Sequence, residues 1–217
     1  MSRGPANGSR APAGPVVFVV DDDTNMRSAL TRLLTLAGLA VEPYASGGEF
    51  LAAARLDRHG CVLLDVSMPG MNGLEVQAEL NERSTELPVI FLTGSADIPI
   101  AVAAMREGAI DFIEKPFQNE HLVGRVRQAL DEHDRLRKSS EELKLVRERL
   151  SSLTPREREV LELVVEGKTS KEIARALGAS HRTIEIHRGH LMEKMHAETL
   201  ADLVRMRLMT REQPAAG

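Results

Sequence analysis

Residues 61–65 of the chain read Cys-Val-Leu-Leu-Asp, a short apolar run that stops at a carboxylate. Comparable apolar runs occupy residues 16–20, 89–92 and 110–113, and a weaker one occupies residues 39–44. These runs do not alternate with polar residues, which is typical of strands that are covered on both faces. Because segments with helical spacing separate the runs, the first half is predicted to be an α/β domain with a doubly wound, five-stranded parallel sheet.

A polar residue follows four of these runs at the point where the strand should end. Asp21 and Asp22 follow the first run, Asp65 the third, Thr93 the fourth and Lys115 the fifth. Since the carboxyl ends of parallel strands lie along one edge of the sheet, these side chains are expected to converge. Clustered carboxylates suit Mg²⁺, a lysine and a hydroxyl suit phosphoryl oxygens, and an aspartate can itself become an acyl phosphate. The pattern therefore predicts a phosphoryl-accepting site.

Each of these residues also has an ordinary structural explanation. Asp21 and Asp22 could favour the start of a helix through its macrodipole. Asp65 could be a turn residue, Thr93 a strand-end hydroxyl, and Lys115 a solvated loop charge. Four such coincidences, each at the end of a strand, are improbable together, which favours the functional interpretation.

Residues 16–135 resemble the receiver domain of two-component response regulators. The matching motifs are Val-Val-Asp-Asp at 19–22, Leu-Leu-Asp-Val-Ser-Met-Pro-Gly-Met-Asn-Gly at 63–73, Phe-Leu-Thr-Gly at 91–94 and Asp-Phe-Ile-Glu-Lys-Pro-Phe at 111–117. The resemblance implies that Asp65 accepts a phosphoryl group from a phosphohistidine on a partner sensor histidine kinase. It also implies that Asp21, Asp22, Asp65 and the backbone carbonyl of Ser67 hold Mg²⁺.

The same resemblance assigns roles to three further residues of the domain. It implies that Lys115 pairs with the acyl phosphate, that Thr93 moves to hydrogen-bond it, and that Phe112 is the aromatic switch that swings inward behind Thr93. The Lys115–Pro116 peptide bond is expected to be cis. The face formed by residues 97–130 is expected to form a homodimer contact on phosphorylation.

The composition and the chain start place limits on localisation. The 217 residues are 42% hydrophobic, but no apolar run approaches the roughly 18 residues that a membrane helix needs. Residues 1–15 are rich in Gly, Pro, Ser and Ala, which predicts a disordered tail rather than a secretory signal. The single cysteine, Cys61, is expected to be a buried thiol. These features predict a cytoplasmic protein that does not enter a membrane.

Two further segments follow the α/β domain. Residues 136–152 are charged and are predicted to form a helical linker, in which Leu136, Leu143 and Leu150 are spaced seven apart. This spacing fits a solvated helix and a short coiled coil about equally. Residues 153–211 are predicted to form a small all-α domain, because capping boxes begin at Thr154 and Thr169 and Gly178 makes a turn between two short helices. Two such helices indicate a helix-turn-helix.

The helix expected near residues 181–195 carries two distinct faces. At 100° per residue, Ile184, Leu191 and Met195 share a core face with His187. The opposite face holds Arg182, Glu185, Ile186, Gly189 and Glu193, with Arg188, His190 and Lys194 toward the flanks. Periodicity alone leaves a DNA-reading helix and an ordinary bundle helix equally open.

Residues 153–209 resemble the LuxR-type helix-turn-helix of the NarL/FixJ class. The matching motifs are Leu-Thr-Pro-Arg-Glu-Arg-Glu-Val-Leu at 153–161, Ser-Lys-Glu-Ile-Ala at 170–174 and Thr-Ile-Glu-Ile-His at 183–187, and the phrase Arg-Thr-Ile-Glu-Ile-His-Arg is FixJ-like. The resemblance implies DNA as a partner. The chain departs from the wider family at Glu185 and Gly189, where lysine is found, and at Ser170, where asparagine is usual, so a lysine's base contact is not carried over.

The side chains themselves suggest how DNA could be contacted. Glu185 could accept a hydrogen bond from the amino group of cytosine, and Ile186 could touch a thymine methyl group. The basic side chains on and around this helix are candidates for phosphate contacts: Lys171, Arg182, Arg188 and Lys194. His187 is expected to lie between the protein core and the DNA backbone. Paired half-sites on DNA are expected to be bound by a dimer.

Two other functions compete with regulated DNA binding. A phosphatase using Asp65 as nucleophile would need a second carboxylate placed for water activation, and no motif supplies one. The chain is therefore expected not to be an enzyme beyond slow self-phosphorylation and self-dephosphorylation at Asp65. An adaptor that binds proteins instead of DNA is the alternative, since residues 151–217 carry 11 Lys/Arg against 10 Asp/Glu.

Overall fold

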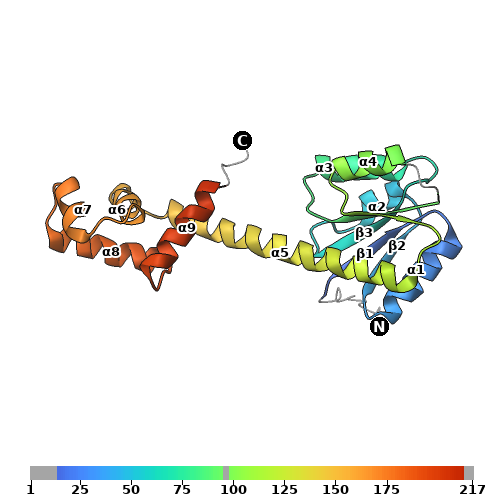
Figure 1. Ribbon diagram of the computed structural model, residues 1–217, viewed down its shortest axis with the longest axis horizontal. Helices are drawn as coiled ribbons and strands as arrows, with labels where there is room; N and C mark the ends of the chain where they lie inside the picture. Colours follow the sequence, from blue (N-terminus) through green and yellow to red (C-terminus); the bar gives the residue numbers. More distant parts are fainter. Residues whose placement is uncertain (1–13, 95–97, 213–217) are drawn as a thin grey trace, which may run out of the picture. The chain divides into compact units, whose positions relative to one another are not determined.

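The computed structural model describes residues 14–94 and 98–212, and it divides into two compact units, Met1–Arg137 and Lys138–Gly217 (Figure 1). Most of the tail expected at residues 1–15 lies outside the described residues. Among the described helices, none combines the length and the apolar character that a membrane span requires.

The first unit is built on a five-stranded parallel sheet. The strand order is β2-β1-β3-β4-β5, and neighbouring strands pair in parallel throughout. This confirms the predicted fold class. The bounds are β1 Val16–Val20, β2 Ala40–Tyr44, β3 Gly60–Asp65, β4 Val89–Thr93 and β5 Asp111–Glu114.

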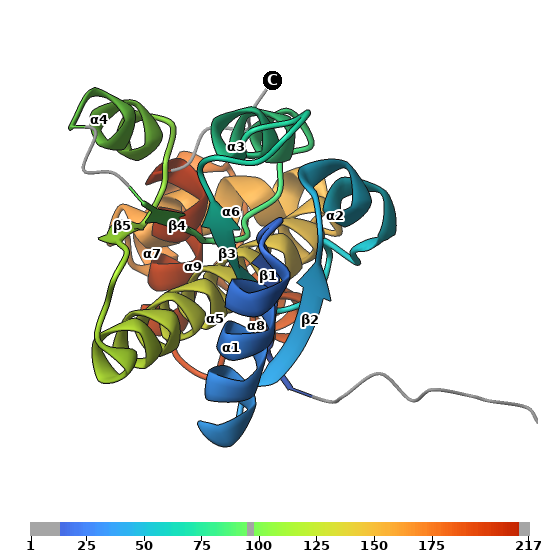
Figure 2. The ribbon, with the colours of Figure 1, turned by 90° about the vertical axis from the view of Figure 1, so that its right-hand side faces the viewer.

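Helices cover both faces of the sheet, which explains why its three inner strands, β1, β3 and β4, are buried along their whole length. Figure 2 shows α1 and α5 on one face and α2, α3 and α4 on the other. Each face of the sheet has its own apolar core. Leu34 of α1 and Val126 of α5 belong to one core, and Phe50 of α2 and Val76 of α3 belong to the other. The bounds are α1 Thr24–Leu36, α2 Gly47–Ala53, α3 Gly73–Glu82, α4 Ile98–Arg106 and α5 Asn119–Ser151.

In the described part of the second unit, the end of α5 is followed by four helices in the arrangement predicted for a helix-turn-helix. Thr154 and Thr169 form the expected capping boxes, and Ser180 caps the third helix. Gly178 has a φ of +60° in the turn between the second and third helices, a left-handed conformation that glycine adopts without steric cost. The bounds are α6 Pro155–Val165, α7 Ser170–Ala176, α8 His181–Met195 and α9 Leu200–Glu212.

The linker predicted at residues 136–152 is helical and forms the last part of α5, which ends at Ser151. Val146 is 2% exposed and belongs with Leu153 to the core of the second unit, and Leu150 packs against that core. Leu136, in contrast, is 48% exposed. The apolar residues near the end of α5 are therefore used within the second unit, and a coiled-coil role for the segment remains a prediction.

One ion pair joins the beginning of α6 to the end of α8. The carboxylate of Glu157, only 3% exposed, accepts hydrogen bonds from Lys194 Nζ at 2.7 Å and from the backbone N–H of Thr154 at 2.8 Å. Burial alone would raise the pKa of Glu157, but these hydrogen bonds outweigh it and lower the pKa to about 2. Because that pKa is depressed in the folded state, the pair stabilises the unit most above the ordinary glutamate pKa and progressively less as the pH falls toward 2.

Replacing Lys194 with methionine tests this arrangement. We expect the free energy of unfolding of the second unit at neutral pH to fall by about 1–3 kcal/mol, because a buried carboxylate loses a charged donor. The unfolding transition should also lose part of its dependence on pH below the ordinary glutamate pKa. Lys168→Met, at an exposed lysine of the same unit, is the control and should unfold as the wild type does. Equal stability of the two variants would contradict the role given to the pair.

Candidate functional site

The ends of three strands meet at the ammonium group of Lys115. Asp21 follows β1, Asp65 is the last residue of β3, and Lys115 follows β5. Lys115 Nζ lies 2.9 Å from Asp21 Oδ2 and 2.6 Å from Asp65 Oδ1. Since β2 and β3 lie on opposite sides of β1, the two carboxylates stand at the point where the strand order reverses, which is where open α/β sheets bind ligands.

Further hydrogen bonds fix the positions of Asp21 and Asp65. Asp21 Oδ1 accepts from the N–H of Asp23 at 2.9 Å, and the Asp21 carbonyl accepts from Arg27 Nη1 at 2.6 Å. Asp65 Oδ2 accepts from the N–H of Ser67 at 2.9 Å. Arg27 is a residue that the sequence analysis missed, because its contact is to a backbone atom and leaves no motif.

A glycine makes room for the strand end that carries Asp65. A Cβ atom at Gly73 would lie 2.4 Å from the carbonyl oxygen of Asp65, closer than non-bonded atoms approach. The N–H of Gly73 donates to the Val66 carbonyl at 3.0 Å, which draws the start of α3 against the end of β3. The last glycine of the 63–73 motif is therefore needed for this close approach.

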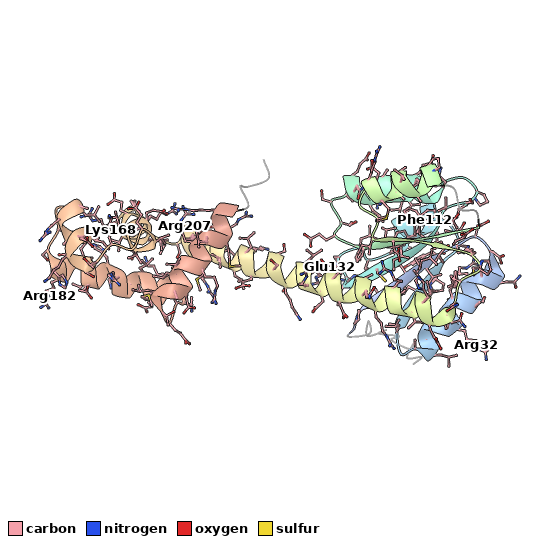
Figure 3. The ribbon with its side chains drawn as sticks, viewed as in Figure 1. Arg32, Phe112, Glu132, Lys168, Arg182 and Arg207 are labelled. Carbon is pink, nitrogen blue, oxygen red and sulfur yellow. The ribbon has the colours of Figure 1, made fainter. Side chains whose placement is uncertain are left out.

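Thr93 and Phe112 lie where the sequence placed them. Thr93 ends β4 and is 4% exposed, and its carbonyl accepts from the N–H of Lys115 at 2.7 Å. Phe112 of β5 is half-buried, and its ring centroid is 6.2 Å from that of Phe91 in β4 (Phe112 is labelled in Figure 3). The Lys115–Pro116 peptide bond is cis, as expected.

Burial and the neighbouring charges act in different directions on the pKa of the Asp65 carboxyl. Burial raises the pKa of Asp65, and the nearby Asp21 carboxylate adds to this effect, although Lys115 opposes both. Burial alone would lower the pKa of Lys115, but its hydrogen bonds to Asp65 and Asp21 raise the pKa above its ordinary value. Two carboxylates in a partly buried site thus rely on one cation for neutralisation.

The oxygen donors at this edge fit a small hard cation. Mg²⁺ is usually held by one or two carboxylates together with waters and phosphate oxygens, and Asp21 and Asp65 supply two converging carboxylates. Asp22 is exposed beside them. The structure brings no three acidic, histidine or cysteine side chains together as a metal cluster among the described residues. The four ligands expected from the sequence therefore remain predictions: Asp21, Asp22, Asp65 and the Ser67 carbonyl.

Two amides on α3 hold the end of α4, and they too were missed from the sequence. Gln77 Nε2 donates to the carbonyls of Ala104 and Glu107 at 3.3 and 3.1 Å, and Asn81 Nδ2 donates to that of Glu107 at 2.9 Å. Gln77 is 2% exposed, and its Oε1 has no hydrogen-bond partner among the described residues. Their sequence signal is only two amides spaced four apart, which is also common on solvated helix faces.

In the second unit, α8 presents the face that periodicity predicted. Ile184, Leu191 and Met195 are buried, whereas His187 is only half-buried. The opposite face is exposed, and Ile186 has 50% of its surface accessible. Arg182, labelled in Figure 3, lies at the start of this helix and is exposed. Lys171, near the start of α7, is also exposed.

Three of the candidate DNA contacts lie within hydrogen-bond or ion-pair distance of other residues of the unit. Arg188 Nη1 donates to Ser170 Oγ at 3.1 Å, which ties α8 to the first residue of α7. Lys194 forms the ion pair with Glu157 described above. Glu185 lies 3.9 Å from His181 Nε2. Lys194 therefore remains a predicted phosphate contact whose ammonium is engaged in the free protein.

Comparisons with known proteins match both units. Residues 17–127 match the response regulator receiver domain, and residues 151–207 match the bacterial regulatory proteins of the luxR family. Nodulation protein W of Bradyrhizobium diazoefficiens is 40% identical over 94% of this chain and 90% of its own length. The transcriptional regulatory protein FixJ of Azorhizobium caulinodans is 43% identical over 94% of this chain and 97% of its own.

Solved structures agree with this assignment. The response regulator StyR is 40% identical and superposes with a TM-score of 0.83, covering 91% of this chain and 100% of that one. Full-length FixJ from B. japonicum is 37% identical with a TM-score of 0.58, covering 92% of this chain and 98% of that one. The chain therefore belongs to the two-component response regulators of the NarL/FixJ class, transcription regulators in which phosphorylation of a receiver domain controls a LuxR-type DNA-binding domain.

Proposed function

We propose that Asp65 is the phosphoryl acceptor and that a sensor histidine kinase is its donor. The observation that carries this proposal is the convergence of Asp21, Asp65 and Lys115 within hydrogen-bond distance at the switch point of the sheet. Receiver domains generally bind Mg²⁺ at the site of phosphorylation. Here Asp21, Asp22, Asp65 and the Ser67 carbonyl would hold the ion, which would neutralise charge on the incoming phosphoryl oxygens.

The residues of the chain then have distinct tasks. The Asp65 carboxylate attacks the phosphorus of the phosphohistidine on the kinase, the bond between phosphorus and the imidazole nitrogen breaks, and the histidine leaves. The product on Asp65 is an acyl phosphate. Lys115 pairs with the new phosphoryl oxygens, and the Thr93 hydroxyl moves to hydrogen-bond them. A phosphoryl group adds about −1.5 to −2 charges and three acceptors, which is enough to draw a neighbouring hydroxyl and loop into a new position. Phe112 would follow by filling the space behind Thr93.

Replacing Asp65 with asparagine tests the acceptor. Wild-type protein incubated with acetyl phosphate and Mg²⁺ should gain one phosphoryl adduct, detected by intact mass and located by peptide mapping, and D65N should gain none. Asp57→Asn is the matched control, because Asp57 is exposed, pairs with Arg55 and lies outside the site. An adduct on D65N, or none on the wild type, would refute the assignment.

Phosphorylation is proposed to promote a homodimer through the face that includes α4 and β5. On α4, Val102 and Met105 are 44% and 48% exposed although both are apolar. Exposed apolar side chains of this kind suit a contact that forms in only one state. Residue 97, at the start of the predicted face, lies outside the described residues.

Met105→Glu should prevent this association. A charge on an apolar contact is costly to bury, so the phosphorylated variant should sediment as a monomer while the phosphorylated wild type sediments as a dimer. Leu36→Glu is the control, because Leu36 is an exposed apolar residue on α1, 78% accessible, and lies outside the proposed face. Unchanged association of M105E would exclude this face.

The second unit is proposed to place α8 in the major groove of paired DNA half-sites. Glu185 and Ile186 would read base edges, and the remaining groups would contact phosphates: Lys171, Arg182, His187, Arg188 and Lys194. The exposure of Ile186 at the centre of a helix-turn-helix recognition face supports this assignment. The comparisons give no support to the alternative of a protein-binding adaptor. A cytoplasmic location is proposed from the same DNA-binding role.

Arg188→Ala should weaken binding to all DNA sequences alike. A phosphate contact carries no sequence information, so the slope of log affinity against log salt should become shallower by about 1. Fluorescence anisotropy on a preferred duplex and a scrambled duplex, each titrated with salt, measures both effects. Ser170→Ala removes the partner of Arg188 within the unit and should leave the slope unchanged. A loss at one base position only would contradict the phosphate assignment.

A further inference from the structure

Gly189 lies in the interior of α8, where glycine is the least favourable residue except proline. Glycine in a helix interior is disfavoured because it loses more backbone entropy than alanine. Its φ is not in the left-handed region. Apart from its chain neighbours and the adjacent backbone of α8, a Cβ atom added there would meet no atom of the described residues within 4 Å. Neither the backbone conformation nor packing within the described part of the chain therefore requires a glycine here.

The position of Gly189 on the surface of α8 offers another reason for a glycine. Residues three and four apart are neighbours on a helix surface, so Glu185 and Ile186 lie one turn before Gly189 and Glu193 lies one turn after it. All three are exposed, as is Gly189 itself. Gly189 thus interrupts a row of longer side chains, because it has no side chain between Glu185 and Ile186 on one side and Glu193 on the other. These residues form the exposed face of α8 that is proposed to meet DNA.

We propose that Gly189 determines DNA specificity by letting the backbone of α8 approach the floor of the major groove. This inference rests on the proposed placement of α8 in DNA. The groove is about 12 Å wide, and a helix with its side chains is about 10–12 Å across, so there is little room to spare. Glu185 and Ile186 are shorter than the arginine or lysine side chains that reach bases from a distance, and they touch base edges only when the helix lies deep.

The phosphate contacts do not depend on this depth to the same extent. Lys171 and Arg182 have long, exposed side chains that can follow the DNA backbone from a shallower position. Added bulk at position 189 should therefore weaken binding to preferred sequences and leave sequence-independent binding nearly unchanged. A general loss of folding would reduce both equally.

The experiment uses the full-length protein phosphorylated with acetyl phosphate and Mg²⁺. Duplexes enriched from a random-sequence pool by the wild type serve as the specific probe, and a scrambled duplex serves as the non-specific one. Gly189→Val should lose about tenfold or more in affinity for the enriched duplexes and should change by no more than about twofold on the scrambled duplex. Gly189→Ala should raise the melting temperature of the second unit and still weaken specific binding, a combination that a folding defect cannot produce.

Two controls separate the possible outcomes. Gly48→Val makes the same change at an exposed glycine of α2 with open space around it, and it should bind both duplexes as the wild type does. Ile186→Ala should alter the enriched sequences if α8 lies in the groove. Equal affinity of G189V and wild type for the enriched duplexes overturns the role of Gly189 and leaves the proposed placement of α8 standing. Failure of the wild type to enrich any sequence, or no effect of I186A, overturns the proposed placement of α8 and the inference with it.

Discussion

The ammonium of Lys115 lies between the carboxylates of Asp21 and Asp65, and the surrounding structure is arranged so that it can do so. For these atoms to meet, β1, β3 and β5 must run in parallel and must end at the same edge of the sheet. Two carboxylates this close repel each other in a partly buried site unless a cation lies between them. The charge balance at the strand ends is therefore the constraint from which the properties of the receiver domain follow.

A phosphoryl group on Asp65 would change that balance more than any uncharged ligand could. Directional contacts link the neighbouring elements in addition to their apolar packing. The Lys115 N–H donates to the Thr93 carbonyl, and the two amides of α3 donate to carbonyls at the end of α4. Contacts of this kind can be exchanged without disturbing the apolar cores on either side of the sheet. The proposed response to phosphorylation would therefore lie in β4, α4 and β5.

The sequence was sufficient to predict the sheet, the strand-end residues and the helix-turn-helix, because each depends on local pattern. Apolar runs, capping boxes and turn glycines are readable over a few residues, and parallel topology then brings Asp21, Asp65, Thr93 and Lys115 to one edge. The contacts that were not predicted join distant positions through generic side chains. Lys194 was interpreted as a phosphate contact, but its partner Glu157 is 37 residues away, and Arg27 bonds a carbonyl that no motif identifies.

If phosphorylation of Asp65 controls the second unit, the state of one carboxylate decides where the protein binds DNA. This can be measured by chromatin immunoprecipitation followed by sequencing, in cells that express either wild type or Asp65→Asn at equal levels under conditions that activate the kinase. We expect discrete peaks in the wild type to shrink or disappear in the variant. Identical peaks of equal height in both strains would contradict it, because DNA binding would then be independent of Asp65.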